Sequence, residues 1–198
     1  MRKIIYVSQW VDVHDGYGER RDAMDQRWVE WLWQAGFLAV PVPNHCKSVE
    51  ALITQRLPGG ILLTGGNNPK GYGGDAPERD STDYVLIDCA VRHKIPLVGV
   101  CRGMQSIVLY FGGTLREVSG HTATRHAVNE KIGRVVNSFH SLAVDRLPDV
   151  LSAVRGVDDG VIEFVTHNTL FIIGIMWHPE REKNFNTDDI ELIRGIFA

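Results

Sequence analysis

The sequence has few of the features that mark disulfide scaffolds and metal centres. It contains only three cysteines, Cys46, Cys89 and Cys101, and no Cys-x-x-Cys pair. A sparse, odd set of this kind disfavours a disulfide framework or a structural zinc site and fits reduced thiols in a cytoplasm. We therefore interpret Cys46 and Cys89 as structural residues.

Long apolar runs and excess positive charge are also missing. No stretch approaches the ~20 apolar residues that a transmembrane helix needs. The first residues lead directly into a predicted strand without the apolar core of a signal peptide, so we expect a cytoplasmic protein. A formal net charge of −3 argues against a nucleic-acid or membrane-surface binder.

The first 111 residues alternate between apolar runs and amphipathic segments. Strands are predicted over residues 3–8, 37–42, 60–64 and 96–100, and helices over residues 22–35, 48–56, 81–93 and 105–111. Residues 12–21 and 70–79 are polar and contain glycine, so we expect loops there. This β-α alternation predicts a parallel sheet with ligands at the carboxyl ends of its strands.

After Gly112 the pattern changes to that of β-hairpins. Extended segments are predicted over residues 114–139, 151–155, 161–166 and 170–177, with a turn at 158–160 and a final helix over 187–197. The predicted fold class is α/β, a mostly parallel central sheet flanked by helices with an added antiparallel β region in the C-terminal half. Since no linker, repeat or low-complexity tract interrupts the chain, we predict one domain over residues 1–198.

Cys101 lies between the strand at 96–100 and the helix at 105–111, with Gly99 and Gly103 two residues to either side. This spacing is that of a nucleophile elbow, a turn so tight that side chains beside the nucleophile would collide. It also places the thiol at a helix N-terminus, where the dipole favours the thiolate. A free cysteine is more often a small buried apolar residue, but the two glycines favour a nucleophile.

A cysteine nucleophile requires a base that takes its proton and later protonates the leaving group. His178 ends the apolar run at 170–177, and Glu180 follows two residues later. In extended chain these side chains face the same way, so Glu180 can orient the imidazole, and Pro179 stiffens the segment. The alternative is a helix or loop start with Glu180 in solvent. Together with Cys101, the pair predicts a Cys101–His178–Glu180 triad.

Attack on a carbonyl forms an oxyanion, which backbone N–H groups usually stabilise. Arg102, directly after the nucleophile, supplies one such group, and the second is assigned to the loop at Gly66 and Asn67, which also fits an ordinary turn. Gln105 lies one helical turn beyond Cys101, so its amide is a candidate for the same pocket. Candidates for contacting an anionic substrate are Arg20, Arg21, Lys70, Arg79, Arg125 and Arg134.

Four collinear segments resemble the class I glutamine amidotransferase-like superfamily, whose fold is flavodoxin-like, and within it the γ-glutamyl hydrolase branch. They are Gly99-Val-Cys-Arg-Gly-Met-Gln105, Leu63-Thr-Gly-Gly-Asn-Asn-Pro69, Val136-Asn-Ser-Phe-His-Ser141 and Trp177-His-Pro-Glu180. Cys-Arg-Gly is more typical of stand-alone hydrolases than of ammonia-delivering subunits. The arginine-rich residues 18–28 resemble small bacterial members found in surface-polysaccharide biosynthesis. Asn67-Asn68 replaces a common Gly-Asp, which leaves open which loop N–H completes the oxyanion hole.

The resemblance implies that the triad attacks a γ-glutamyl amide, forms a γ-glutamyl thioester, releases the amine and lets water free glutamate. It implies that the glutamate α-amino and α-carboxylate groups are held, partly through backbone contacts, by Gln105, Asn137, Ser138, Phe139, His140 and Ser141. The expected partner is a small-molecule γ-glutamyl substrate. We expect no metal, no organic cofactor, no nucleic acid, no membrane and no obligatory synthase partner.

Two other functions remain open at this stage. The chain is also compatible with a glutaminase subunit that passes ammonia to a separate synthase. A third hypothesis is a non-catalytic binding or redox-sensing protein with a reactive cysteine. The presence of both His178 and Glu180 counts against it, because a sensor needs no ordered base.

Overall fold

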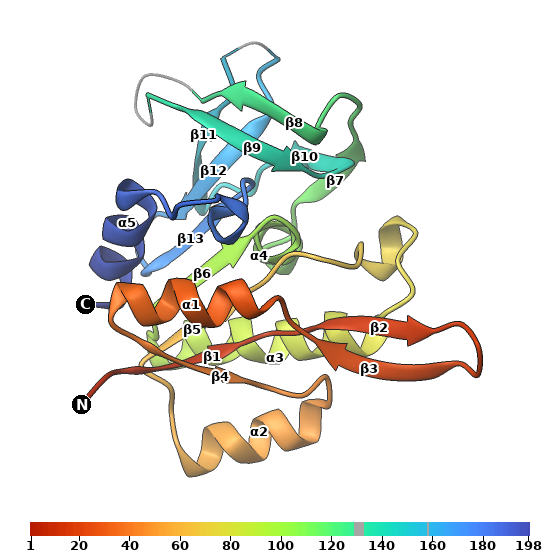
Figure 1. Ribbon diagram of the computed structural model, residues 1–198, viewed down its shortest axis with the longest axis vertical. Coiled ribbons are helices and arrows are strands. Elements are labelled where there is room, and N and C mark those ends of the chain that lie inside the picture. The colour runs from red at the N-terminus through yellow and green to blue at the C-terminus, as the bar shows by residue number, and fades with distance from the viewer. Residues whose placement is uncertain (129–132, 158) are drawn as a thin grey trace.

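A computed structural model describes residues 1–128, 133–157 and 159–198 of the chain. Its centre is one sheet in the order β11-β12-β13-β6-β5-β1-β4 (Figure 1). The parallel strands are β1 (Ile4–Val7), β4 (Leu38–Pro41), β5 (Gly60–Leu63), β6 (Leu97–Val100) and β13 (Ile172–Ile175). At one edge, β12 (Ile162–His167) and β11 (Leu151–Arg155) continue the sheet antiparallel. The predicted α/β class is confirmed.

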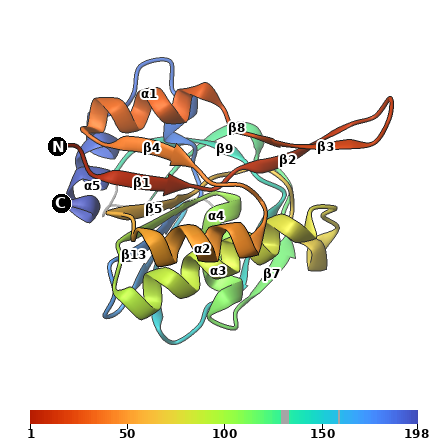
Figure 2. The same ribbon diagram turned by 90° about the horizontal axis from the view of Figure 1, so that it is seen from below.

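Helices cover both faces of this sheet (Figure 2). One face carries α1 (Gln26–Ala35) and α5 (Thr187–Phe197), and the other carries α2 (Cys46–Gln55), α3 (Pro77–His93) and α4 (Arg102–Tyr110). Each face has its own apolar core, with Trp31 and Ile193 buried in the first and Leu86 and Ile107 in the second. Burial of apolar area at ~25 cal/mol per Å² drives this layering. No helix in the described part of the chain is both long and apolar enough to cross a membrane.

The antiparallel additions of the C-terminal half form two further ribbons. β7 (Thr114–Glu117) pairs with β10 (Leu142–Arg146), and β8 (Thr122–Ala127) pairs with β9 (Val135–Phe139). This confirms the predicted change of pattern after Gly112. Residues 129–132 of the predicted extended segment, and residue 158 of the predicted turn, lie outside the described residues.

The predicted loop at 12–21 is wrong, because the chain forms a hairpin there. β2 (Trp10–His14) pairs antiparallel with β3 (Glu19–Ala23), and the ribbon projects from the body (Figure 1). Its mostly exposed residues carry charges that are depleted in buried strands, so the segment resembled a loop. Helix α1 accordingly starts later than predicted. Its N-cap is Asp25, which accepts a hydrogen bond from Arg27 N at 2.9 Å.

The predicted loop at 70–79 and the predicted helix starts nearby also need correction. A short 3₁₀ helix, η1, occupies Lys70–Tyr72, and α3 begins at Pro77 rather than at residue 81. Proline lacks the N–H that a first helical turn leaves unbonded, so it fits this helix start. Helix α4 begins at Arg102, directly after Cys101, instead of at residue 105.

Strand β6 is central to the arrangement because it lies between β5 and β13. Gly99 in β6 is opposite Leu63 of β5 on one side and Gly174 of β13 on the other. All three strands run parallel, so the segments that follow them emerge at the same edge of the sheet. The fold therefore brings together the residues after Leu63, Val100 and Ile175.

Gly103 is predicted to be essential for the packing of α4 against this sheet. An alanine Cβ there would lie 2.3 Å from the carbonyl oxygen of Leu63 and 2.7 Å from its Cβ. We expect Gly103→Ala to lower the free energy of unfolding by ~1–3 kcal/mol or more, measured by urea denaturation. The control is Gly195→Ala in α5, where a Cβ meets no heavy atom within 4 Å, and a gain of up to ~1 kcal/mol is expected. Equal stability of the two variants would contradict the prediction.

Candidate active site

Cys101 lies at the sharp turn from β6 into α4, as the glycine spacing predicts. Its backbone has φ 53° and ψ −105°, a conformation that costs a non-glycine residue of order 1–3 kcal/mol. Its N–H donates to Ile175 O at 2.7 Å, and its carbonyl accepts from Gln105 N at 3.1 Å. Gly99 and Gly103 approach so closely that a Cβ on Gly99 would lie 2.5 Å from the Gly103 carbonyl carbon. The surrounding packing thus holds the strained residue in place.

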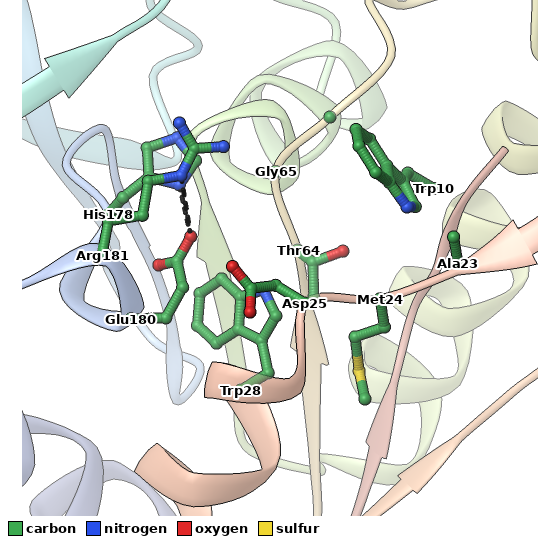
Figure 3. A pocket seen from close by; sticks show the side chains of 11 residues that line it. Trp10, Ala23, Met24, Asp25, Trp28, Thr64, Gly65, His178, Glu180 and Arg181 are labelled. Carbon is green, nitrogen blue, oxygen red and sulfur yellow. Dashed lines mark hydrogen bonds and ion pairs between the residues drawn. The ribbon is translucent and has the colours of Figure 1, made fainter. Parts of the chain in front are cut away.

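His178 and Glu180 follow β13 and form a buried pair (Figure 3). Nδ1 of His178 lies 2.6 Å from Oε1 of Glu180, and both residues are 2% exposed. The side chain of Asn137 holds the backbone of His178 at two points, accepting from His178 N and donating to His178 O, both at 2.8 Å. The ring of Phe139 packs edge-on to the imidazole, with centroids 5.7 Å apart. The orientation of His178 is therefore fixed from three sides.

The charges around His178 favour its protonated form. Burial acts to lower its pKa, but the charge of the nearby Cys101 and the hydrogen bond and charge of Glu180 outweigh this and raise the pKa from 6.5 to about 9. Nδ1 of His178 is engaged by Glu180, and Nε2 is buried without a hydrogen-bond partner among the described residues, which leaves Nε2 to serve the sulfur. A thiolate beside an imidazolium is the reactive state of a paired cysteine.

A fully buried arginine supports the loop after β5. Nη2 of Arg79 donates to Thr64 O at 2.7 Å and to Gly65 O at 2.8 Å, and Nη1 donates to Asn67 Oδ1 at 3.3 Å. Burial lowers the pKa of Arg79 to about 10, while interaction with the charge of Cys101 opposes that change. Arg79 therefore orders the loop and places a positive charge near the sulfur.

The predicted oxyanion donors lie on this loop and at the start of α4. Among the described residues, no protein group accepts a hydrogen bond from the N–H of Gly66, Asn67 or Arg102. Gly66 has φ +114°, and a Cβ there would lie 2.7 Å from Arg79 Nη1 and 2.8 Å from Trp10 Cβ, so only glycine fits. The side chain of Arg102 turns into the protein and forms ion pairs with Asp80 and Asp83.

A cavity of about 380 Å³ opens over Cys101. Most of the predicted site residues line it, namely Gly66, Asn67, Cys101, Arg102, Gln105, Phe139, His140, Ser141 and His178, together with Asn68 and Arg181. Glu180 lies behind His178. The side chains of Asn137 and Ser138 are engaged elsewhere, Asn137 with the His178 backbone and Ser138 with His121 O at 2.8 Å. A direct substrate contact from these two residues stays a prediction.

The buried carboxylate of Glu163 organises a group of histidines next to this cavity. Its Oε1 lies 3.1 Å from His126 Nε2, 3.7 Å from His140 Nε2 and 3.8 Å from His121 Nδ1. Burial acts to raise the pKa of Glu163, but bonds and charges from His126 and His140 lower it below its ordinary value. His121, His126 and Glu163 have ligand atoms within 4.8 Å of one another and form a group with the donor types of a metal site. The expected absence of a metal stays a prediction.

Besides Asn68, the residue at the cavity that the sequence reasoning missed is Arg181. Its Nε lies 3.5 Å from Glu180 Oε1, and its side chain is 41% exposed. The predicted basic candidates are placed elsewhere, since Arg20 pairs with Glu78 and Arg125 with Glu182. Of the described residues that line the Cys101 cavity, the arginines are Arg102 and Arg181. The available signal was the position of Arg181 directly after Glu180.

The chain is similar in sequence or fold to several known proteins. Residues 4–135 and 117–180 match the family model described as Peptidase C26. The chain is 28% identical to a γ-glutamyl-CDP-amidate hydrolase of Campylobacter jejuni, covering 98% of this chain and 97% of that protein. It is 28% identical to a γ-glutamyl-γ-aminobutyrate hydrolase of Escherichia coli over 91% of this chain and 85% of that one. A Thermoplasma acidophilum crystal structure, described as a GMP synthase subunit, has the same fold, with a TM-score of 0.71 and 21% identity over 100% of this chain and 93% of that chain.

The raised pKa of His178 predicts an effect of removing the sulfur. In Cys101→Ala the negative charge that raises the pKa of His178 is lost, so this pKa should fall clearly below the value of about 9 in the parent chain. The measurement is an NMR titration of the His178 ring. Because His178 binds its proton more tightly in the folded chain than in the unfolded chain, its protonation stabilises the folded state. This contribution to the free energy of unfolding is complete below pH 6.5 and is lost as the pH rises toward 9. An unchanged pKa of His178 in the variant would show that the imidazole does not interact with the Cys101 thiol.

Proposed function

The chain belongs to the peptidase C26 family, and from this premise we propose that it is a cysteine hydrolase that cleaves γ-glutamyl amides and releases L-glutamate. The supporting observation is that Cys101, at a strained turn, lines the same cavity as His178. Nδ1 of His178 is in turn hydrogen-bonded to Glu180. Nucleophile, base and orienting group are the parts that covalent acyl transfer requires. Relatives named as γ-glutamyl hydrolases add support.

In the first half of the proposed reaction, the Cys101 thiolate attacks the γ-carbonyl carbon of the substrate. The oxygen becomes an oxyanion, to which the N–H of Arg102 and an N–H of Gly66 or Asn67 donate. Loss of one such donor typically costs ~3–4 kcal/mol of transition-state stabilisation. The C–N bond then breaks, and His178 gives its proton to the leaving nitrogen. The products of this half are a γ-glutamyl thioester and the free amine.

Water completes the proposed cycle. Neutral His178 takes a proton from a water molecule, whose oxygen attacks the thioester carbonyl through the same oxyanion position. The C–S bond breaks, glutamate leaves, and the thiolate and imidazolium of the starting state are restored. Glu180 keeps the imidazole in one orientation through both halves and stabilises its positive charge.

Recognition of the glutamyl group is assigned to the deeper part of the Cys101 cavity. Oε1 of Gln105 is buried and, among the described residues, has no hydrogen-bond partner, while its Nε2 donates to Leu142 O at 3.1 Å. A buried carbonyl oxygen left over in this way is suited to accept from the α-ammonium group. Phe139, His140 and Ser141 line the same cavity and are proposed to contact the α-carboxylate.

As the substrate we propose a γ-glutamyl phosphoramidate nucleotide, γ-glutamyl-CDP-amidate, with modification of capsular polysaccharide in the cytoplasm as its setting. The relative in Campylobacter jejuni with this named activity matches nearly the full length of both chains. Arg181 contributes a half-exposed cation at the cavity, suited to a phosphate. Because water accepts the glutamyl group in the proposed reaction, the chemistry needs no obligatory synthase partner.

The proposal predicts glutamate release that depends on Cys101. Purified protein and its Cys101→Ala variant would be assayed with glutamine, γ-glutamyl amines and γ-glutamyl-CDP-amidate. We expect release by the parent and a loss of at least ~10³-fold in the variant, since Cys101 is the one thiol among the described residues that line the cavity. No release from any substrate, or equal rates for the two proteins, would refute the hydrolase and favour a binding or sensing role. Release only after a synthase is added would favour a glutaminase subunit.

Asn137 is predicted to act by positioning His178. Asn137→Ala removes both hydrogen bonds to the His178 backbone and leaves the lining of the cavity unchanged. We therefore expect kcat to fall ~10–100-fold with little change in KM, because a misplaced base costs the chemical step more than binding. Steady-state kinetics measure both constants. A large rise in KM at constant kcat would instead assign Asn137 to substrate binding.

A further inference from the structure

A second cavity, of about 270 Å³, lies against His178 and has no role in the reaction described so far. It is lined by Trp10, Ala23, Met24, Asp25, Trp28, Thr64, Gly65, Gly66, His178, Glu180 and Arg181 (Figure 3). Gly66, His178 and Arg181 also line the cavity over Cys101, so the two spaces share a wall. Helix α1, its N-cap and the β2–β3 hairpin provide most of the other side.

The positions of Cys101 and His178 indicate which part of the substrate lies next to the second cavity. The γ-carbonyl carbon must meet Cys101, and the glutamyl group extends from there toward Gln105 and His140. The nitrogen that leaves takes its proton from His178, so whatever it carries starts beside that imidazole. The second cavity adjoins the first at Gly66, His178 and Arg181, and Gln105 lines only the first. We propose that it binds the amine portion of the substrate, an inference that rests on the proposed function.

Trp10 indicates which amines this site takes. It is 43% exposed at the first position of β2, and Figure 3 places its ring across the cavity from His178 and Arg181. Asn67 ties the hairpin to the oxyanion loop, with Oδ1 accepting from Val11 N and Nδ2 donating to Val11 O, both at 2.8 Å. The indole is therefore held at a fixed position beside the reacting centre. A half-exposed, ordered aromatic face is suited to stacking a planar ring of the amine.

Arg181 adds a preference for negative charge. Its guanidinium lies 4.5 Å from the centroid of the Phe139 ring and beside Glu180, between the two cavities. A planar guanidinium pairs well with phosphate or carboxylate. The site thus favours an amine that carries both a planar ring and an anionic group, a chemistry that a nucleoside phosphoramidate combines. Trp10 and Arg181 are the residues that select it.

Two chromogenic probes and glutamine test this selection. Glutamine releases ammonia and leaves the second cavity empty, whereas γ-glutamyl-p-nitroanilide places a planar ring there. The ratio of kcat/KM for the anilide to that for glutamine is expected to fall at least ~10-fold in Trp10→Ala. Trp33→Ala is the matched control, because Trp33 is 56% exposed and packs under Arg2 instead. Melting temperatures verify that each variant is folded.

Arg181 is tested with a ring-carboxylated analogue of the anilide. The parent should prefer the carboxylated probe over the uncharged one, and Arg181→Gln should lose at least ~5-fold of that preference. Comparing two anilides cancels any general effect of the variant on His178. Unchanged ratios in both Trp10→Ala and Arg181→Gln, or an equal fall in Trp33→Ala, would overturn the inference and leave the hydrolase intact. Cleavage of γ-glutamyl-CDP-amidate but of neither anilide would likewise overturn the inference and leave the hydrolase intact. The proposed function itself fails if the parent releases glutamate neither from these three substrates nor from γ-glutamyl-CDP-amidate.

Discussion

The site depends on the close contact between β6 and the first turn of α4. Gly99 and Gly103 have no side chains, so the helix can begin directly after the strand and leave Cys101 alone at the bend. Cys101 keeps its strained backbone because Ile175 O binds its N–H at 2.7 Å and Gln105 N binds its carbonyl at 3.1 Å. The first bond comes from β13, which leads to His178, and the second comes from α4, which lines the cavity. The strain is thus balanced by the same packing that assembles the site.

Buried positive charge accompanies this geometry. Arg79 is completely buried and, among the described residues, forms its hydrogen bonds with Thr64, Gly65 and Asn67 and no ion pair with a carboxylate. Burying an unpaired guanidinium is costly, and the lowered pKa of Arg79 reflects that cost. A negative sulfur on Cys101 offsets part of it. The arginine that orders the loop after β5 therefore also places its positive charge near the nucleophile.

The parallel sheet and the sharp turn at Cys101 could be predicted from the sequence, because both produce local sequence patterns. Apolar runs mark β5, β6 and β13, and Gly99, Cys101 and Gly103 lie within five residues. The β2–β3 hairpin was missed because β3 is charged and mostly exposed and so gives no apolar strand pattern. The contact of Asn137 with His178 joins segments 41 residues apart. The roles of Arg79 and Arg181 depend on which loops fold next to them, and no local pattern encodes that.

The Cys101 cavity and the second cavity are formed by elements that differ in how firmly they are attached to the main sheet. On the glutamyl side, Cys101, Gln105 and His178 stand on elements anchored in the main sheet or packed on it, so their positions cannot change without disturbing the core. On the amine side, Trp10 comes from a two-stranded ribbon outside that sheet. Its attachments include Asn67, hydrogen bonds from Asn44 to Asp22 and the exposed Arg20–Glu78 pair. A surface pair of this kind contributes only ~0–1 kcal/mol. Changes in the ribbon can therefore alter which amine is accepted while the nucleophile and its base keep their geometry.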